Sequence, residues 1–402
     1  MLISIMAFGS PWIRYATTSN LMNCGTTKKP HGKFGSNFIN MNNSIDCFDN
    51  FYQGKKIFIT GHTGFKGSWL SLWLKELGAQ VTGFALDPYT SKDNFVLSGL
   101  SSKIEDIRGD IRNAEKLDKM IQQIQPDIIF HLAAQPLVRL SYQQPVETYQ
   151  TNLIGSLHVM EAFRKCTSAK TAVMITTDKC YENTEKMDGY RETDPMGGYD
   201  PYSSSKGATE LAISSWRRSF MNPKEYNKHG KSIASVRAGN VIGGGDWTTD
   251  RIIPDCVRAL ESNKTIAIRN PKAIRPWQHV LEPLNGYLLL AKKMWEEPAQ
   301  YCEGWNFGPN MEAVENVWTV ASKVIQYYGS GTLTDHSSVN APHEANLLIL
   351  DIQKAKTKLN WLPRMNIDQT IKMTVDWYRN YQNSDVYQLC LKQIQQYCTY
   401  DF

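Results

Sequence analysis

The sequence predicts an α/β fold: a doubly wound parallel sheet with a smaller carboxyl-terminal lobe that closes over a ligand. Three observations predict it. After Gln53, short β-branched runs alternate with longer periodic stretches, which is typical of a parallel sheet covered by helices. A glycine-rich turn joins the first run to the first periodic stretch. Beyond Asn240 the alternation gives way to loops rich in Gly, Pro and Trp, with shorter helices between them.

Six strands are expected in the sheet, and each is followed by a segment that can form a helix. Their regular return along the chain indicates helical crossovers between parallel strands. No internal repeat is visible. The expected strands are residues 56–60 (KIFIT), 80–85 (QVTGFA), 104–109 (IEDIRG), 127–134 (DIIFHLAA), 171–176 (TAVMIT) and 232–240 (SIASVRAGN).

The chain is expected to divide into four parts. Residues 1–50 form an amino-terminal extension, 51–240 hold most of the sheet domain, 241–382 most of the smaller lobe, and 383–402 a terminal helix. Apolar residues in "VYQLCLKQIQQYC" recur at three- and four-residue spacing. This spacing predicts a helix that packs on the core or on a neighbouring subunit.

The amino-terminal extension differs from the rest in its charge. Nothing acidic precedes Asp46, while basic residues are scattered among Ser, Thr, Asn and Gly. This composition is typical of an organelle transit peptide. The alternative is a misassigned start, with synthesis beginning at Met41, in which case the first strand follows soon afterwards. On either interpretation the extension is expected to be disordered or not translated as part of the domain.

Composition narrows the class of protein. With 42% hydrophobic and 21% charged residues, the chain of 402 residues has an ordinary soluble globular composition. The net charge of +5 is too small to argue for nucleic acid, although it suits an anionic small ligand. The eight cysteines form no CxxC pair and indicate reduced thiols in a cytoplasmic protein without structural zinc. No apolar run approaches the roughly 18 residues of a membrane span.

The glycine-rich turn carries the first functional signal. "ITGHTGFKGSWLSLWL" places Gly61, Gly64 and Gly67 between a strand and a helix. Glycines there let the backbone approach a pyrophosphate, whose charge is met by amide groups at the positive helix end. A tight turn that needs glycine only for packing is the alternative. The GxxGxxG spacing favours a Rossmann-type sheet of the short-chain dehydrogenase variety, with Phe65 also expected beside the cofactor.

Further cofactor contacts are expected where the next strands end. Asp87 can accept hydrogen bonds from the adenosine ribose hydroxyls, which would favour NAD over NADP. An ordinary turn residue is the alternative. Asp110 and Ile111 end the third strand, where an acid can meet the adenine amino group. Ala133 and Ala134 are small enough for the cofactor to lie against the sheet. Each of these segments taken alone is ordinary loop sequence, so their value lies in their positions.

The segment "YSSSK" gives the strongest catalytic signal. Tyr202 and Lys206 are four residues apart and therefore share one face of a helix. A cation beneath a tyrosine favours the phenolate and lowers the pKa of the tyrosine from about 10. The pair then becomes a base for a substrate hydroxyl. The alternative is an exposed Tyr–Lys pair on a helix surface.

Together these segments resemble the nucleotide-sugar 4,6-dehydratases of the extended short-chain dehydrogenase/reductase family. The resemblance rests on "GHTGFKGSWLSLWL", "HLAAQPLVRLSY", "TTDKCYEN", "YRETDPMGGYDPYSSSKGATEL", "SVRAGNVIGGGDW" and "RNPKAIRPWQHVLEPL", and covers about Phe51 to Trp377. It implies a hydro-lyase reaction in which NAD⁺ oxidises carbon 4 of the sugar, water leaves carbons 5 and 6, and the hydride returns to carbon 6.

The resemblance also implies roles for the catalytic residues. Tyr202 would take the proton of the 4-hydroxyl, Lys206 would stabilise the phenolate and bind the nicotinamide ribose, and Thr177 would hydrogen-bond the same oxygen. Asp178 would protonate the departing 6-hydroxyl. Lys179 stands where the dTDP-glucose members carry the glutamate that removes the carbon 5 proton. The substitution recurs in the members that act on CDP-glucose, so it does not indicate a loss of activity. The quoted motifs together imply CDP-glucose as the substrate.

Two questions stay open at this stage. Lys179 can be the base only if it is neutral, which desolvation beside cationic groups can achieve; otherwise it stays charged and stabilises the enolate. The second question is which reaction the protein catalyses. A nucleotide-sugar 4-epimerase uses the same tyrosine and lysine but has no acid such as Asp178. A catalytically silent nucleotide-binding regulator would be expected to lack Tyr202, Lys206 or Asp178.

The smaller lobe is expected to hold the nucleotide diphosphate. Arg251 and Arg275 can make two-pronged contacts to phosphate, and Asn240 ends the strand that faces the sugar. Each of them alone is more often a surface or loop residue, so the assignment depends on the resemblance. A nucleotide sugar is the expected partner, with no nucleic acid and no membrane. A homodimer or homotetramer, packed through a four-helix bundle, is usual for this fold.

Overall fold

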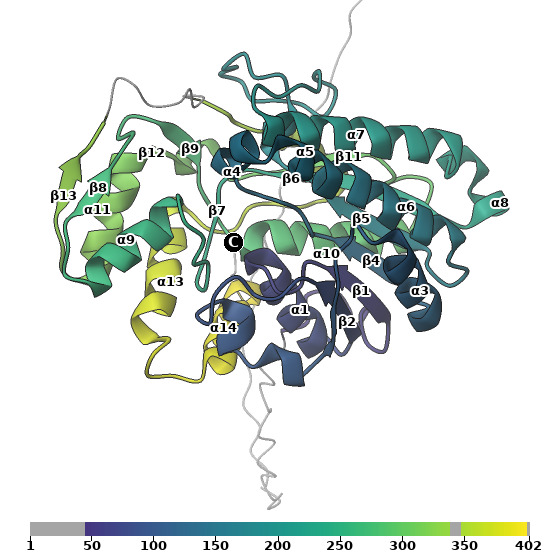
Figure 1. Cartoon of the computed structure of the whole chain (residues 1–402), viewed down its shortest axis with the longest axis horizontal. Helices are drawn as coiled ribbons and strands as arrows, with labels where there is room; N and C mark the ends of the chain where they lie inside the picture. The colour runs from purple at the N-terminus through teal and green to yellow at the C-terminus, as the bar shows by residue number, and fades with distance from the viewer. Residues whose placement is uncertain (1–44, 338–346, 400–402) are drawn as a thin grey trace, which may run out of the picture. The chain divides into compact units, whose positions relative to one another are not determined.

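A seven-stranded parallel sheet organises the part of the chain that the computed structural model describes, residues 45–337 and 347–399 (Figure 1). Its strand order is β11-β6-β5-β4-β1-β2-β3. The chain runs outward from β1 to β3 and then crosses back to β4, so the order reverses between β1 and β4. A ligand crevice is expected at this reversal. The strands are β1 (Lys56–Thr60), β2 (Gln80–Ala85), β3 (Glu105–Arg108), β4 (Ile128–His131), β5 (Thr171–Ile175), β6 (Ser232–Ala238) and β11 (Gly304–Phe307).

Helices cover both faces of this sheet because alternate strand residues are buried on opposite sides. Ile57 and Ile59 of β1 belong to the larger core cluster, whereas Phe58 belongs to the second. The larger cluster lies under α1, α10 and α14, and the second under α3, α6 and α7 (Figure 1). These helices are α1 (Phe65–Glu76), α3 (Ala114–Ile124), α6 (Gly155–Lys165), α7 (Pro201–Ser219), α10 (Leu281–Glu296) and α14 (Val386–Cys398).

The segments that follow β6 also form three short two-stranded pairs and, besides α10 and α14, three longer helices. β7 (Val241–Ile242) pairs with β10 (Gln278–His279), β9 (Ile274–Pro276) with β12 (Val314–Asn316), and β8 (Ile266–Ile268) with β13 (Leu333–Asp335). The helices are α9 (Ile252–Glu261), α11 (Val317–Tyr328) and α13 (Ile367–Asn380). The shorter elements are α2 (Asn94–Leu97), η1 (Leu100–Ser102), α4 (Val138–Gln143), α5 (Pro145–Tyr149), η2 (Gln150–Ile154), η3 (Asp178–Cys180), η4 (Pro223–Glu225), α8 (Tyr226–His229), η5 (Met311–Ala313) and α12 (Gln353–Lys358).

The six expected strands are all present in the sheet, and the terminal helix is α14. This helix packs on α1 and α13 of its own chain, with Ile394 and Tyr397 fully buried. One strand and one helix were not expected where they lie. β11 and α10 come from beyond residue 240 and yet pair or pack with β6. The sheet domain is therefore not confined to residues 51–240, and the division into two lobes stays a prediction.

The folded part of the chain begins before the predicted boundary at residue 51. Ile45 and Phe48 are buried in the larger core cluster, and the Phe48 ring lies 6.0 Å from that of Trp73 on α1. Expecting residues 45–50 to be disordered was therefore wrong. Most of the predicted extension, with its transit-peptide and Met41 interpretations, lies outside the described residues. Among those that are described, no helix is long and apolar enough to cross a membrane.

Candidate active site

The glycine turn after β1 is held in a conformation that requires glycine at two of its three positions. Gly61 has φ +77°, and a Cβ there would lie 2.7 Å from the backbone nitrogen of Ala133. A Cβ on Gly67 would lie 2.0 Å from the carbonyl oxygen of Gly61. At Gly64 the nearest atom would be 3.5 Å away, so this side of the turn stays open. The first turn of α1, which starts at Phe65, contains no acidic side chain and suits a phosphate.

A buried polar chain joins the carboxyl ends of β1 and β4 beneath this turn. Thr60 Oγ1 lies 2.7 Å from Nδ1 of His131, and the other ring nitrogen lies 2.8 Å from the hydroxyl of Ser156. The backbone nitrogen of Ala133 donates to Thr60 Oγ1 at 3.2 Å. Burial, with a smaller effect from Lys206, lowers the pKa of His131 to about 3. The ring is therefore neutral and positions the half-buried Ala133 beside the glycine turn.

The remaining residues expected to bind the cofactor lie at strand ends but differ in their surroundings. The Asp87 side chain, 87% exposed after β2, has Oδ1 3.5 Å from Nε of Arg108. Asp110 accepts hydrogen bonds from the backbone and guanidinium of Arg112 on both carboxylate oxygens. Ile111 is buried in the second core cluster, so its side chain packs in the core. Ala134, half-buried, follows β4 as expected. Asp87 and Ala134 thus stay accessible to a cofactor, whereas both carboxylate oxygens of Asp110 already accept hydrogen bonds from Arg112.

Tyr202 and Lys206 lie on the first two turns of α7 and are almost completely buried, at 8% and 4% exposure. The helix begins there because the side chain of Asp200 accepts a hydrogen bond from the backbone nitrogen of Ser203. Gly207 allows close packing, since a Cβ there would lie 2.4 Å from the Gly197 carbonyl oxygen. The alternative of an exposed Tyr–Lys pair is wrong.

Burial dominates the electrostatics of this pair. It raises the pKa of Tyr202 to about 12; Asp178 adds to this rise, whereas a hydrogen bond with Thr177 and the charge of Arg251 oppose it. Burial lowers the pKa of Lys206 to about 8, against the attraction of Glu210. The sequence predicted that Lys206 lowers the pKa of Tyr202 below 10. In the protein chain by itself this does not hold, because desolvation of the phenolate outweighs the effect of the nearby cations.

The segment "TTDKC" lies where β5 ends and turns into η3, and it packs against α7. Thr177 donates a hydrogen bond from Oγ1 to Oδ1 of Asp178 at 2.9 Å and accepts one from the backbone nitrogen of Lys179. The Asp178 side chain is buried, and within the described residues its Oδ2 has no hydrogen-bond partner. Burial raises the pKa of Asp178, although Lys179, Thr177 and Arg275 oppose the rise. Lys179 is half-buried beside it.

The three residues expected to bind the substrate lie near this segment. Arg251 is paired with Asp246 at 2.9 Å and is close enough to lower the pKa of Tyr202. Arg275 is buried on β9, and its positive charge lowers the pKa of Asp178. Asn240 follows β6, and its carbonyl oxygen accepts a hydrogen bond from the backbone nitrogen of Gln278 at 3.0 Å. The structure therefore places both arginines near the predicted catalytic residues, and their binding to a diphosphate stays a prediction.

Two residues of this region were not expected from the sequence. Lys66, in the glycine turn, has a pKa lowered to about 8 by burial and by the charges of Arg251 and Lys206. It therefore adds a further cation beside Arg251 and Lys206. Glu210 lies one turn beyond Lys206 on the same face of α7 and is buried. The continuation of the four-residue spacing from Tyr202 through Lys206 was the signal that could have identified it.

Glu210 ties the segments around the site together. Its carboxylate accepts hydrogen bonds from Thr176 of the loop after β5, from Ser235 of β6, and from two guanidinium nitrogens of Arg237 at 2.9 and 2.8 Å. Arg237 also donates to the hydroxyl of Tyr181, which follows η3. The buried pair thus joins α7, β6 and the loop that carries Asp178 and Lys179.

We expect Arg237→Met to destabilise the protein by about 3–5 kcal/mol, because it leaves the buried carboxylate of Glu210 without its partner. The exposed pair between Arg191 and Asp351 provides the control, and Arg191→Met should stay within about 1 kcal/mol of wild type. Urea unfolding of both variants measures the difference. Equal stabilities would contradict the structural role of the buried pair.

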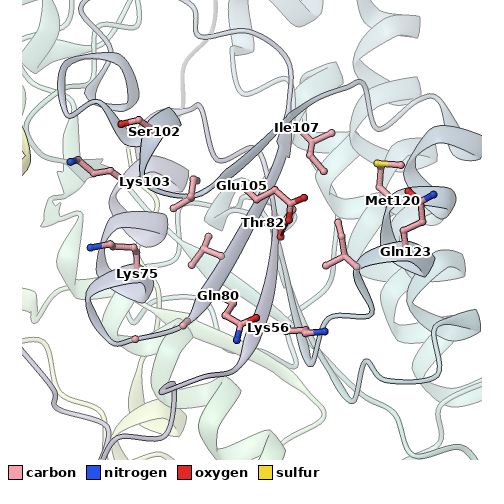
Figure 2. A pocket seen from close by; sticks show the side chains of 15 residues that line it. Lys56, Lys75, Gln80, Thr82, Ser102, Lys103, Glu105, Ile107, Met120 and Gln123 are labelled. Carbon is pink, nitrogen blue, oxygen red and sulfur yellow. Dashed lines mark hydrogen bonds between the residues drawn. The ribbon is translucent and has the colours of Figure 1, made fainter.

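A cavity in the described part of the chain lies away from these residues. Lys56 and Gln80, labelled among its lining residues in Figure 2, are the first residues of β1 and β2, so the cavity lies at the amino ends of these strands. Its volume is about 850 Å³, and its lining includes Lys56, Lys75, Lys103, Thr82 and Glu105. None of the predicted site residues lines it. We therefore place the active site by its chemistry at the carboxyl edge and not by cavity size.

Comparison with known proteins settles the family. A family model described as GDP-mannose 4,6 dehydratase matches residues 58–374. The chain belongs to this family. A CDP-glucose 4,6-dehydratase from Salmonella typhimurium is 51% identical over 343 residues, which cover 85% of this chain and 96% of that protein. A dTDP-glucose 4,6-dehydratase from Xanthomonas campestris pv. campestris is 25% identical, over 80% of this chain and 92% of that protein.

A solved structure of this dehydratase family confirms the predicted fold class. The crystal structure of dTDP-glucose 4,6-dehydratase from Bacillus anthracis in complex with NAD has a TM-score of 0.68 to this chain at 20% identity. The match covers 84% of this chain and 100% of that chain. This match confirms the Rossmann-type sheet. The family model and the 51% identical relative confirm the resemblance to the extended short-chain dehydrogenase/reductase family.

Proposed function

We propose that this family member converts CDP-glucose to CDP-4-dehydro-6-deoxyglucose and water, with NAD⁺ regenerated in each turnover. The observation that carries the proposal is the meeting of Tyr202, Thr177 and Asp178 at the carboxyl end of β5. Sequence supports the substrate, since the chain is 51% identical to the Salmonella typhimurium CDP-glucose 4,6-dehydratase over 96% of that protein.

The residues present fit a nicotinamide dinucleotide. Gly61 and Gly67 admit no side chain, Gly64 is open at the amino end of α1, and Asp87 is exposed after β2 for the ribose hydroxyls. A carboxylate at this position disfavours the additional phosphate of NADP. When bound, NAD⁺ supplies the chemistry of accepting a hydride from carbon 4 and returning it to carbon 6.

Tyr202 is assigned as the base that takes the proton of the 4-hydroxyl. In the chain alone its pKa is raised to about 12, so the phenolate depends on the positive charges around it. Arg251 supplies one of these, and Lys206, one turn along α7, supplies another. Thr177 lowers the pKa of Tyr202 and is assigned to hydrogen-bond the same substrate oxygen. Lys206 is also assigned to the ribose beside the nicotinamide.

Asp178 is assigned as the acid that protonates the departing 6-hydroxyl. An acid for this step must carry a proton, and burial favours the protonated form by raising the pKa of Asp178. Thr177 engages one carboxyl oxygen, while Oδ2 has no partner among the described residues and is available to the substrate. This arrangement also separates the proposal from a 4-epimerase, which expels no hydroxyl and needs no such acid.

Lys179 is assigned as the base for the carbon 5 proton. It stands beside Asp178 and is half-buried, so both groups can face the same sugar carbon pair. Arg275 and Arg251 are assigned to the diphosphate, and Asn240 to the sugar. Arg275 is buried beside Asp178, whereas a residue with only a surface role would be exposed.

We expect Lys179→Met to abolish exchange of the carbon 5 hydrogen with deuterated water and to stop formation of the 4-keto product. Proton NMR of CDP-glucose incubated with the variant measures both. Lys186→Met, on the loop that follows, is the control, because Lys186 pairs with Asp194 and lies outside the site. Exchange that slows but persists would show that Lys179 stabilises the enolate instead. Wild-type exchange and turnover would remove it from the mechanism.

The substrate is tested by incubating the purified protein separately with CDP-glucose, dTDP-glucose, UDP-glucose and GDP-mannose. We expect the 4-keto-6-deoxy product to form fastest from CDP-glucose. Faster dehydration of another nucleotide sugar would correct the base preference while keeping the reaction. Conversion of CDP-glucose to its 4-epimer would overturn the dehydratase assignment.

The proposal includes the cellular setting. It places the reaction in the cytoplasm, since the described cysteines are free thiols and five of them are buried. It takes the protein as a homodimer or homotetramer, and the product as a precursor in deoxysugar biosynthesis, as for O-antigen and lipopolysaccharide. Size-exclusion chromatography with light scattering measures the assembly directly.

A further inference from the structure

Two cysteines from opposite ends of the described chain lie against each other. The Sγ atoms of Cys47 and Cys398 are 3.1 Å apart although 351 positions separate them in the sequence. Both side chains are partly exposed, whereas the other cysteines in the described ranges are buried. A small oxidant can therefore reach this pair in preference to Cys166, Cys180, Cys256, Cys302 and Cys390.

The surrounding structure holds the two thiols in place. Cys47 follows Ile45 in the segment that precedes β1, and Cys398 is the last residue of α14. The carbonyl oxygen of Ile45 accepts contacts from both thiols, at 3.8 and 3.4 Å. On either side, the ring of Trp73 on α1 lies 6.0 Å from Phe48 and 5.9 Å from Tyr397. The pairing therefore depends on core packing on both sides.

The two thiols share one hydrogen bond, which stabilises a thiolate at the sulfur that accepts it. A hydrogen bond from the Cys398 thiol lowers the pKa of Cys47; burial opposes this effect, Arg364 assists it, and Asp46 opposes it. The same shared hydrogen bond and burial raise the pKa of Cys398. Arg364 is fixed nearby because its guanidinium donates to the carbonyl oxygens of Tyr397 and Cys398. A thiolate at one sulfur of the pair is thus stabilised by the thiol of the other, as between a nucleophile and a resolving cysteine.

We propose that Cys47 and Cys398 are a redox-active pair that closes to a disulfide when it meets a small disulfide oxidant such as oxidised glutathione. The Cys47 thiolate attacks one glutathione sulfur, a mixed disulfide forms, and one glutathione leaves as its thiolate. Cys398 then loses its proton to solvent and attacks the sulfur of Cys47, which expels the second glutathione. Two protein thiols are oxidised, and one glutathione disulfide is reduced to two thiols.

The bond would tie the segment before β1 to the end of α14. Helix α14 packs on α1, whose amino end carries the glycine turn. Closing so long a loop removes conformational freedom from the unfolded chain, so the melting temperature Tm should rise by roughly 5 °C. The inference concerns stability and does not depend on the proposed reaction.

The test is a titration of the purified full-length protein with oxidised glutathione, followed by alkylation, intact mass and peptide mapping. We expect wild type to lose two hydrogens and yield one linked peptide pair containing Cys47 and Cys398. Cys398→Ser should stop with one bound glutathione, and Cys47→Ser should react more slowly. The Tm should rise only for oxidised wild type.

Three outcomes would overturn the inference. The pair does not close if both thiols are still free after the titration and are therefore alkylated. The pair also does not close if wild type accumulates only mixed disulfides with glutathione. A linked protein whose Tm equals that of the reduced form would contradict the stabilising tie. Because the readouts are mass and Tm, loss of enzymatic activity in any sample leaves these conclusions unaffected.

Discussion

Replacing Tyr202 with phenylalanine is expected to lower the turnover of CDP-glucose by about 100-fold or more, which is the usual contribution of a positioned general base. The change removes one hydroxyl from a buried site and leaves the ring to fill the same space. Binding of the nucleotide sugar should therefore stay nearly intact. Steady-state rates of 4-keto product formation, with Kd measured by calorimetry, separate these two effects.

The control is Tyr199→Phe, three residues earlier, where the ring is 80% exposed. This variant should keep wild-type turnover, since the change removes the same hydroxyl outside the buried site. If Tyr202→Phe retains more than about a tenth of the wild-type rate, the loss is too small for Tyr202 to be the general base of this reaction. The tyrosine would then serve only in substrate positioning.

Replacing Asp178 with asparagine should lower dehydration by about 100-fold or more while leaving the earlier steps in place. Asparagine can still accept the hydrogen bond of Thr177, but it cannot release a proton to the 6-hydroxyl. Oxidation at carbon 4 and loss of the carbon 5 proton do not need this acid. CDP-glucose recovered from deuterated water should therefore contain deuterium at carbon 5, with little 4-keto-6-deoxy product.

Asp188→Asn is the control for this variant, because Asp188 is an exposed carboxylate on the loop that follows. The pH dependence gives a second readout. Burial raises the pKa of Asp178, so wild type should lose activity as the pH rises through that value and the acid becomes ionised. Asp178→Asn should lack this decline. An unchanged dehydration rate in Asp178→Asn would exclude Asp178 as the acid.

Features written in local patterns could be predicted from the sequence. The six strands followed from β-branched runs, the turn from the spacing of Gly61, Gly64 and Gly67, and the buried Tyr202–Lys206 pair from their separation on one helix. The carboxyl ends of parallel strands lie at one edge of the sheet. These local signals were therefore enough to predict that Thr177 and Asp178 lie at the same edge as the glycine turn.

Features that arise from distant contacts could not be predicted in this way. β11 has four residues, and only its pairing with β6 makes it a strand of the main sheet. The engagement of Asp110 by Arg112 and the burial that raises the pKa of Tyr202 depend on the folded surroundings. Residues 45–50 were missed because their packing on Trp73 is specified by α1 and α14 and not by their own composition.

The most direct test of the proposed reaction follows one hydrogen through a turnover. CDP-glucose carrying deuterium at carbon 4 is incubated with the purified protein and NAD⁺ in ordinary water, and the product is analysed by NMR and mass spectrometry. We predict CDP-4-dehydro-6-deoxyglucose with the deuterium at carbon 6, because the hydride removed from carbon 4 returns to the same sugar. Formation of the 4-epimer with deuterium back at carbon 4, or no 4-keto sugar at all, would contradict the assignment.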